Sequence, residues 1–486
     1  MFDTRLDAAR CRPRYNLQRQ EEAQAAGYGP VVRRAGPLTL ALMQVRAHVL
    51  RTDERRSPAV GTVAGGRNLG TALTGQNGED TVTSPTVAPQ TPSPVRERIA
   101  ALDALRGIAV GGILLANVTS FFGTMFLGAE QAAALPTAAI DPVVSFLEHV
   151  LVEGKFYSIF SLLFGIGFGV QLSRGGDVAV SRFRRRLRIL LAIGTVHAVL
   201  VWYGDILMLY ALLGFTLPWF ARRSDDSLLR WTVGLLAAPT AIYLVIVAAT
   251  GSLAHDVVEF GEGIPPEILQ LVAPMGTGGV TDAFIGNLVF LVGRWFELFS
   301  TVRFAKVLGM FILGLWLVRR GIALDPAAHR ATLVRWRRLG WTIGLPANVL
   351  AAWAYTQWAY MPASLGGLLG VVGQAIGFPL LAIGYAATLT LLVVDGRRVM
   401  GAFAHVGRMA LTNYLSHSIV CVVLAYGFGF GLFWRVGAST VTAIALGIFL
   451  VQIPLSAWWL GRYQFGPVEW IWRRLTYRQP LPIRRA

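Results

Sequence analysis

The stretch Leu102–Phe122, LDALRGIAVGGILLANVTSFF, decides the fold class of this chain. It is long enough and apolar enough to form a helix that crosses a bilayer. Asp103, Arg106 and Asn117 nevertheless share one face, because the eleven residues from 106 to 117 make about three helical turns. Polar groups in hydrocarbon are costly unless they are paired or line a polar interior. The stretch therefore predicts a helix whose polar stripe faces the inside of a membrane helix bundle, where substrate chemistry or transport takes place.

The composition extends this prediction along the chain. Of 486 residues, 54% are apolar and 15% are charged, and the mean hydropathy is +0.53, whereas soluble domains carry about 25% charged residues. We therefore expect an all-α fold, a polytopic transmembrane helix bundle of about ten spans. The expected spans are residues 102–123, 146–172, 187–203, 205–221, 231–250, 302–318, 339–358, 365–394, 409–427 and 438–460.

The net charge of +17 has an uneven distribution that indicates membrane topology. The segments expected on one side hold 24 arginines, whereas the opposite segments hold two, Arg294 and Arg435. An excess of arginine marks cytoplasmic segments, so both termini are expected in the cytoplasm. The charge then serves topology and contact with anionic lipid. The expected partner is the lipid bilayer and not a nucleic acid; the oligomeric state is left open.

Three regions differ from the spans. Residues 1–95, rich in Arg, Gly, Thr and Pro, are expected to form a cytoplasmic tail without a core, unless the start codon lies further downstream. Residues 251–301 end in a predicted amphipathic helix that lies on the outer surface or covers the bundle. Residues 479–486 form a short C-terminal tail. Cys11 and Cys421 fit neither a disulfide framework nor a metal site, and no bound cofactor is expected.

Several ionisable residues of the first half could carry chemistry. Asp103 and Arg106, three residues apart, form either a structural ion pair or a gate that contacts a cytosolic cosubstrate. Asn117 either bridges helices or holds a reacting group by hydrogen bonds. Lys155 lies in an apolar run and needs a carboxylate partner. Glu148, seven residues earlier on the same face, or Glu153 would supply it.

The segment TVHAVLVWYGDILMLYALLGF carries the strongest candidate for a general base. His197 lies within a predicted span, and histidine is the side chain best suited to move protons near neutral pH. Asp205 either caps the next helix or, if the turn folds the two helices together, orients the imidazole. His149 and His417 are competing candidates.

The second half adds basic and amide groups. Arg303 and Lys306 lie at the outer mouth of a span, where they either snorkel to the interface or bind an anionic substrate group. Asn413 and His417 are four residues apart, with Arg408 at the cytoplasmic boundary. Arg408 could meet phosphates together with Arg182–Arg188. Glycine pairs at Gly107/Gly111 and Gly165/Gly169 predict close helix packing.

Five ordered stretches resemble the YeiB-like family of bacterial inner-membrane proteins. They are LDALRGIAVGGILLANV, EGKFYSIFSLLFGIGFG, HAVLVWYGDILMLYALLG, GRMALTNYLSHS and GPVEWIWRRLTY, and the resemblance covers residues 98–478. It implies a transmembrane domain over these residues and a location in the bacterial inner membrane. The family is catalogued largely as a domain of unknown function.

The opening pattern LDALRGIAV…N also resembles, more distantly, the transmembrane acyltransferase superfamily, which includes heparan-α-glucosaminide N-acetyltransferase. This resemblance implies transfer of an acyl group from cytosolic acyl-CoA, a co-substrate, to a glycan, lipid or small-molecule acceptor. Asn117 matches the family asparagine. The heparan enzyme has a catalytic histidine in the loop that follows, but residues 118–148 contain no histidine. His197, or else His149, would then act as the base, and Lys155, Asn117 or Arg303 would stabilise the oxyanion.

Two further classes of function remain open. A transporter or flippase for an anionic or lipid-linked solute would use the same polar interior, although the sequence has no clear half-to-half repeat. A non-catalytic partner subunit is disfavoured, because buried ionisable groups are expensive to retain for scaffolding alone.

Overall fold

The computed structural model describes residues 94–250, 266–358 and 365–484, so the predicted tail, residues 1–95, lies outside them except for its last two residues. The described part is helical, with no β-strand, which confirms the all-α prediction. Its helices are α3 (Pro94–Phe121), η3 (Thr124–Phe126), α4 (Ala129–Ala133), α5 (Asp141–Leu151), α6 (Lys155–Leu200), α7 (Leu207–Gly214), α8 (Leu217–Phe220), α9 (Asp225–Thr250), α10 (Pro266–Val272), η5 (Ala273–Gly276), α11 (Val280–Ser300), α12 (Arg303–Arg319), α13 (Arg330–Leu339), η6 (Gly340–Gly344, a π-helical turn), α14 (Leu345–Trp358), α15 (Leu365–Val394), α16 (Val399–Arg408), α17 (Ala410–Ala425), α18 (Ala438–Arg462) and α19 (Pro467–Tyr477).

Several of these helices can cross a membrane. Six helices of the described chain are long and apolar enough to do so, and α16 with α17, bent by 79°, makes a seventh if the pair is one span. The fold is thus a polytopic transmembrane helix bundle. The structure does not confirm ten spans, because helices in some expected spans are shorter. Between residues 205 and 221 the chain forms the short helices α7 and α8, and α12 has 17 residues.

Helix α6 folds back on itself. The ring of Phe183 lies 4.4 Å from that of Phe168, although fifteen residues of straight helix would separate them by about 22 Å. The reversal falls between these two residues, where the sequence carries Gly175 and Gly176. We call residues 155–168 the first leg and residues 183–200 the second leg. They correspond to the predicted spans 146–172 and 187–203.

Close glycine contacts join the central helices, as the sequence predicted. A Cβ on Gly165 would overlap the carbonyl group of Phe311 in α12, and one on Gly107 of α3 would overlap the carbonyl oxygen of Phe403 in α16. In a membrane, apolar side chains gain little by leaving lipid for another helix. Helices therefore associate through close packing, and small residues let their backbones approach closely. The first leg of α6 is therefore held against α12, and α3 against α16.

The bend between α16 and α17 is held by Glu469 of α19. Its Oε1 accepts hydrogen bonds from the N–H groups of Leu411 (2.6 Å) and Thr412 (3.0 Å), and its Oε2 from the Thr412 hydroxyl (2.5 Å). The first N–H groups of a helix have no partner within the helix and favour a negative charge. Glu469 thus caps α17 at the point where the chain changes direction, which links the GRMALTN and GPVEW stretches.

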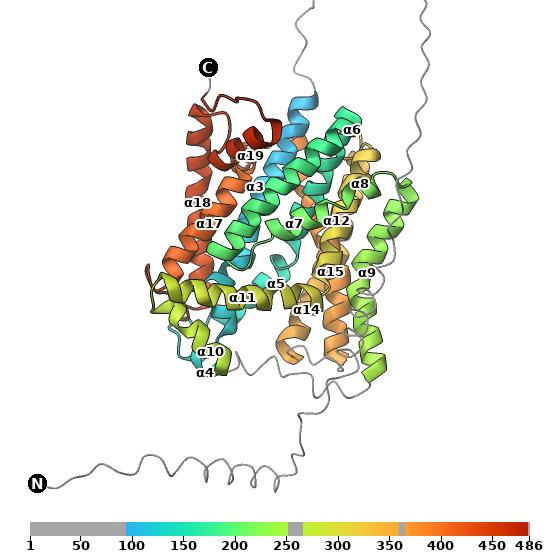
Figure 1. Ribbon diagram of the computed structural model, residues 1–486. Helices are drawn as coiled ribbons and strands as arrows, with labels where there is room; N and C mark the ends of the chain where they lie inside the picture. The colour runs from blue at the N-terminus through green and yellow to red at the C-terminus, as the bar shows by residue number, and fades with distance from the viewer. Residues whose placement is uncertain (1–93, 251–265, 359–364, 485–486) are drawn as a thin grey trace, which may run out of the picture. The chain divides into compact units, whose positions relative to one another are not determined.

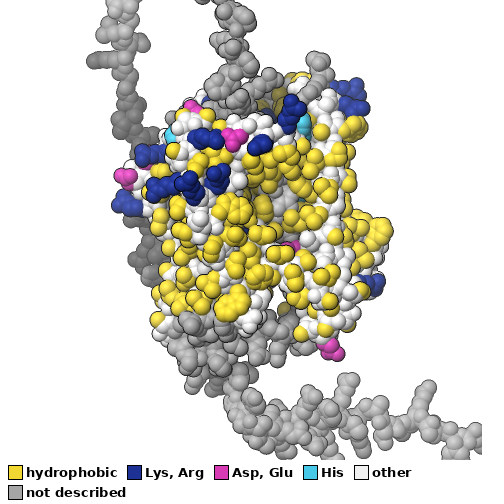
Figure 2. Space-filling model, turned by 180° about the vertical axis from the view of Figure 1, so that it is seen from behind, with side chains coloured by type: hydrophobic (Ala, Val, Ile, Leu, Met, Phe, Trp, Pro, Cys, Tyr) yellow, Lys and Arg dark blue, Asp and Glu magenta, His cyan; other side chains and the backbone are white. Residues whose placement is uncertain are grey.

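Helix α11 runs across the bundle, whereas most of the long helices run along it (Figure 1). It buries Ala283, Asn287 and Phe290 against its neighbours. This placement agrees with the predicted amphipathic helix that covers the bundle. On the opposite face, apolar side chains cover the middle of the molecule, and most of the Lys and Arg side chains gather toward the upper end (Figure 2). The upper end in both views is the one that carries α19.

Candidate functional site

The turn after α6 brings His197 and Asp205 into direct contact. The His197 Nδ1 atom lies 2.8 Å from Asp205 Oδ2, and both side chains are buried. Asp205 Oδ1 accepts a hydrogen bond of 2.8 Å from the N–H of Met208 in the first turn of α7. Asp205 thus both caps the helix and orients the imidazole, so the two alternatives drawn from the sequence hold together.

This contact determines which nitrogen of His197 is basic. A carboxylate oxygen can only accept, so in the neutral imidazole Nδ1 carries the proton and Nε2 carries the lone pair. The His197 Nε2 atom is buried and has no hydrogen-bond partner among the described residues. The pair therefore presents a proton acceptor inside the bundle, backed by a negative charge.

Two other helices enclose the His197–Asp205 pair. The Tyr414 ring of α17 lies 5.5 Å from the His197 ring, and its hydroxyl accepts a hydrogen bond of 3.4 Å from the Ile206 N–H. Asn287 of α11 donates to the carbonyl oxygens of Ala198 (2.9 Å) and Val199 (3.0 Å). These carbonyls lie at the end of α6, where helical partners are missing. Asn287 thereby fastens α11 to the end of α6, close to His197.

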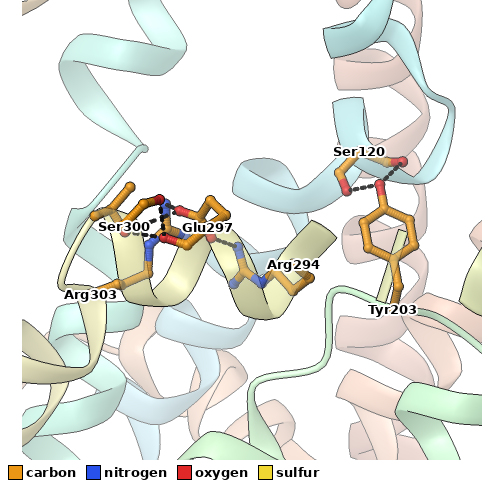
Figure 3. A network of polar contacts seen from close by, with 7 residues as sticks. Ser120, Tyr203, Arg294, Glu297, Ser300 and Arg303 are labelled. Carbon is orange, nitrogen blue, oxygen red and sulfur yellow. Dashed lines mark hydrogen bonds and ion pairs between the residues drawn. The ribbon is translucent and has the colours of Figure 1, made fainter. Parts of the chain in front are cut away.

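Helix α11 also carries a charged network (Figure 3). Glu297 accepts from Arg294 at 2.8 Å through Oε2 and from Arg303 of α12 at 2.6 Å through Oε1. The Arg294 Nε atom is buried and has no hydrogen-bond partner among the described residues. The network thus contains two guanidinium groups for one carboxylate, and Arg294 keeps an unused buried donor.

A hydrogen-bonded tyrosine lies in the same view (Figure 3). The Tyr203 hydroxyl bonds the side chain of Ser120 at 2.7 Å and donates to the Ser120 carbonyl at 3.0 Å. Asn117, three residues earlier in α3, is half-buried and has no hydrogen-bond partner among the described residues. No contact joins Asn117 to His197 within the part of the chain that the structure describes.

Both lysines of the chain lie against one aromatic ring. The Nζ atoms of Lys155 and Lys306 are 4.4 Å and 5.7 Å from the centre of the Phe378 ring. Lys155 is fully buried and donates to the carbonyl oxygen of His149 at 2.6 Å. We call Lys155 and Lys306 the lysine pair. The pair brings two basic side chains to the same aromatic ring, an arrangement that suits the binding of an anionic group.

The predicted ion pair between Lys155 and a carboxylate was wrong. Glu148 instead accepts from the Thr442 hydroxyl at 2.5 Å, and Glu153 pairs with His149 at 3.2 Å. The physical reason is a break in the helix, because Gly154 adopts a left-handed conformation with φ of 81° between α5 and α6. Positions 148 and 155 therefore do not lie on one helical face.

Asn413 and His417 join α17 to α18. Asn413 donates to the Val406 carbonyl and the Ser456 hydroxyl, both at 3.1 Å, and His417 Nε2 lies 2.5 Å from Gln452 Oε1. The Val406 carbonyl belongs to the end of α16, so Asn413 satisfies a polar group exposed by the bend. These two residues form a buried bridge between helices, and among the described residues they make no hydrogen bond or ion pair with His197 or Asp205.

The remaining predicted residues lie toward the end that carries α19. Asp103 and Arg106 form the expected ion pair at 2.6 Å. Arg408 donates to the Gln464 carbonyl at 3.4 Å. The arginines that lie beside Arg185 and Arg188 come from α19, as Arg474 and Arg478, and not from Arg408.

Sequence reasoning missed Tyr414 and Asn287 as neighbours of the site, and it missed the Arg294–Glu297 pair on the same helix as Asn287. That helix was predicted to lie on the outer surface or to cover the bundle, and Asn287 and Arg294 are seven residues apart and so lie on one face of it. That spacing was the available signal. Tyr414 carries none, because a tyrosine in a membrane helix is most often a packing residue.

The fold and the site define a polytopic transmembrane helix bundle with a buried histidine–aspartate pair. Residues 317–479 match the family described as a protein of unknown function (DUF418). The uncharacterised protein YxaH of Bacillus subtilis is 31% identical over 409 residues, covering 81% of this chain and 97% of YxaH. YeiB of Escherichia coli, also uncharacterised, is 30% identical over 410 residues, covering 79% of this chain and 98% of YeiB.

An uncharacterised 39.9 kDa protein of Bacillus acidopullulyticus is 28% identical over 398 residues, covering 81% of this chain and 97% of that protein. No solved structure matches the chain. The chain belongs to the YeiB-like family, as the sequence resemblance predicted.

Proposed function

We propose that this protein is a membrane-embedded acyltransferase that moves an acyl group from acyl-CoA to a glycan, lipid or small-molecule acceptor. The observation that carries the proposal is the buried His197–Asp205 pair with its unpartnered Nε2 atom. A buried imidazole oriented by a carboxylate is the arrangement that general-base catalysis requires. The resemblance of Leu102–Phe122 to the acyltransferase superfamily supports the same class of reaction.

In the proposed reaction, His197 Nε2 accepts the proton of the acceptor hydroxyl or amine. The freed lone pair attacks the thioester carbonyl, the carbon–sulfur bond breaks, and the CoA thiolate leaves with the proton returned by Nε2. Asp205 stays ionised and stabilises the imidazolium formed in between. The proton is thus conserved and no further reactant is needed.

The developing oxyanion needs a donor close to the base. Arg294 fits this role best, because its buried Nε atom has no hydrogen-bond partner among the described residues, and Asn287 fastens the same helix to the end of α6 beside His197. Arg303 shares Glu297 with Arg294 and would support it. The lysine pair would hold an anionic part of the acceptor. This assignment replaces Lys155 and Asn117, which were the first candidates for the oxyanion.

The proposed orientation follows the arginine distribution. We place the protein in the bacterial inner membrane with both termini in the cytoplasm, so that the arginine-rich segments face the compartment that contains acyl-CoA. The acyl group would then travel from that side to His197, which lies beside α11.

The test measures acyl transfer directly. Membrane vesicles from cells that overproduce the protein are incubated with radiolabelled acetyl-CoA or longer acyl-CoAs, and free CoA thiol and labelled product are quantified. We expect His197→Gln to lower the rate by about 10²- to 10⁴-fold, the usual effect of losing a general base. His329→Gln is the matched control, because His329 is only half-buried and its side chain bonds only the Asp325 carbonyl.

An unchanged rate in His197→Gln protein, with normal thermal unfolding, would remove His197 from the mechanism. Absence of CoA release by the wild type with every acyl-CoA would overturn the acyltransferase proposal.

A transporter or flippase is the second candidate, and the two lysines beside the Phe378 ring favour it. Basic side chains inside a membrane bundle often mark the path of a charged solute. Under this alternative, labelled solute or lipid would cross vesicle membranes that contain the protein without any CoA release. Transfer of the labelled acyl group to a new covalent product would exclude transport as the main activity.

A further inference from the structure

A groove lies between the second leg of α6 and helix α19, and its lining does not include His197 or Asp205. It has a volume of about 800 Å³. Four arginines are among its lining residues, Arg185, Arg188, Arg474 and Arg478. We call it the arginine groove. Nothing in the proposed transferase reaction uses it, and the inference below stands independently of that reaction.

The charges of the arginine groove are not balanced by acidic residues. None of the four arginines forms an ion pair within the described part of the chain, although Arg185 donates to the Thr476 carbonyl at 3.2 Å. Beside the groove, burial and then the nearby charge of Arg473 lower the pKa of the Arg186 guanidinium to about 10. Like charges gathered in this way create a positive field that attracts an anion.

The groove continues into an apolar strip on α6. Ile189 and Ala192 form part of its lining, and Val196 and Leu200 follow at helical spacing with 57% and 65% of their surfaces exposed. From Arg188 to Leu200 the helix rises by about 18 Å. The hydrocarbon of one bilayer leaflet is about 15 Å thick, half of the whole core. The strip therefore has the length of a lipid tail region.

We propose that the arginine groove binds an anionic phospholipid, with the phosphate on the arginines and an acyl chain along the strip from Ile189 to Leu200. Guanidinium groups bind phosphate oxygens through paired hydrogen bonds. A soluble phosphate compound such as CoA would satisfy the arginines but would leave the apolar strip without a role. The combination of both surfaces in one groove favours the lipid.

The test compares lipids and variants on the full-length protein in detergent. Bound lipid is counted by native mass spectrometry, and thermal unfolding is followed while phosphatidylglycerol or phosphatidylcholine is added. A ligand of the folded state must raise the melting temperature as it saturates. The variant is Arg188→Gln with Arg478→Gln, since neither side chain makes a hydrogen bond, ion pair or ring contact within the described structure.

The matched control is Arg397→Gln with Arg398→Gln, which removes the same charge from two exposed arginines after α15. We expect phosphatidylglycerol to bind at least tenfold more tightly than phosphatidylcholine. The groove variant should lose about tenfold in affinity for phosphatidylglycerol, and the control should lose little.

Three outcomes would overturn the proposal. The first is equal retention of phosphatidylglycerol by the wild type and the groove variant. The second is equal affinity for phosphatidylcholine, which would leave no role for the charge. The third is displacement of phosphatidylglycerol by inorganic phosphate or CoA at comparable concentration, which would identify the groove as a site for a soluble phosphate.

Discussion

Asp205 uses its two carboxylate oxygens for different purposes, and this division explains how a buried charge is maintained. Oδ1 accepts the N–H of Met208 and Oδ2 faces His197 Nδ1. A buried carboxylate is tolerated only when such partners satisfy it. The same two contacts fix the tautomer of His197, so the helix cap and the orientation of the base depend on one side chain.

Asp205→Asn separates these two roles. The amide oxygen can still cap α7, but an amide N–H facing Nδ1 makes that nitrogen an acceptor and moves the imidazole proton to Nε2. We expect acyl transfer to fall by about 10²- to 10⁴-fold, with a change in melting temperature smaller than that of Asp205→Leu, which removes the cap as well. Both are measured with the vesicle assay and thermal unfolding. Full activity in the asparagine variant would show that the tautomer is unimportant.

Glu469, like Asp205, is a buried carboxylate that caps a helix, but it lies outside the candidate site. It accepts three hydrogen bonds from Leu411 and Thr412 at the start of α17. Glu469→Ala leaves these donors without a partner in a buried position. We expect the free energy of unfolding to fall by about 1.5–3 kcal/mol, measured by denaturation of the purified protein. Glu130→Ala, at an exposed position in α4, should change it little. Equal effects of the two substitutions would contradict the capping role.

At the scale of elements, helix packing depends on where glycines face a neighbour. Gly165 and Gly167 lie two residues apart on α6, and a Cβ would overlap the Phe311 carbonyl at Gly165 but would meet nothing within 4 Å at Gly167. Gly165→Ala should therefore destabilise the protein by about 1–3 kcal/mol through overpacking. Gly167→Ala should be neutral or stabilise it by up to about 1 kcal/mol. Thermal unfolding of both variants tests this prediction. A Gly167→Ala variant less stable than the Gly165→Ala variant would show that α6 and α12 are not packed this closely.

The elements also show what the sequence could and could not predict. Apolar length and glycine spacing located the helices, including both legs of α6, because these signals are local. The contact between His197 and Asp205 was one of two alternatives, since it depends on how the turn at Val201–Ile206 folds. The Lys155–Glu148 pair failed because a single glycine, Gly154, interrupts the helix.

Contacts between segments distant in the sequence left no local pattern from which they could be predicted. Nothing in α19 by itself indicates that Glu469 caps α17, and nothing in the α6 arginines indicates that Arg474 and Arg478 lie beside them. Such contacts depend on the tertiary arrangement, and a sequence read by periodicity contains only faces and spacings.

At the scale of the whole molecule, the two ends of the bundle differ in chemistry. The end that carries α19 holds the arginine groove, whereas α11 and α4 lie toward the other end (Figure 1). His197 is fastened to α11 through the Asn287 hydrogen bonds to the end of α6. Under the proposed function, an acyl-CoA that arrives at the α19 end would pass its acyl group inward to His197, which requires that end to face the cytoplasm.

Cysteine labelling tests this orientation. In a parent protein with Cys11→Ser and Cys421→Ala, a single cysteine is introduced by Gln479→Cys after α19 or by Glu130→Cys in α4, both at exposed positions. A membrane-impermeant maleimide is added to intact spheroplasts and to permeabilised ones. Because arginine-rich segments stay on the cytoplasmic side, we expect Glu130→Cys to react in both samples and Gln479→Cys only after permeabilisation. The opposite pattern would place the α19 end outside the cytoplasm, so the arginine distribution would no longer support entry of acyl-CoA from that end, and the transporter would become the favoured function.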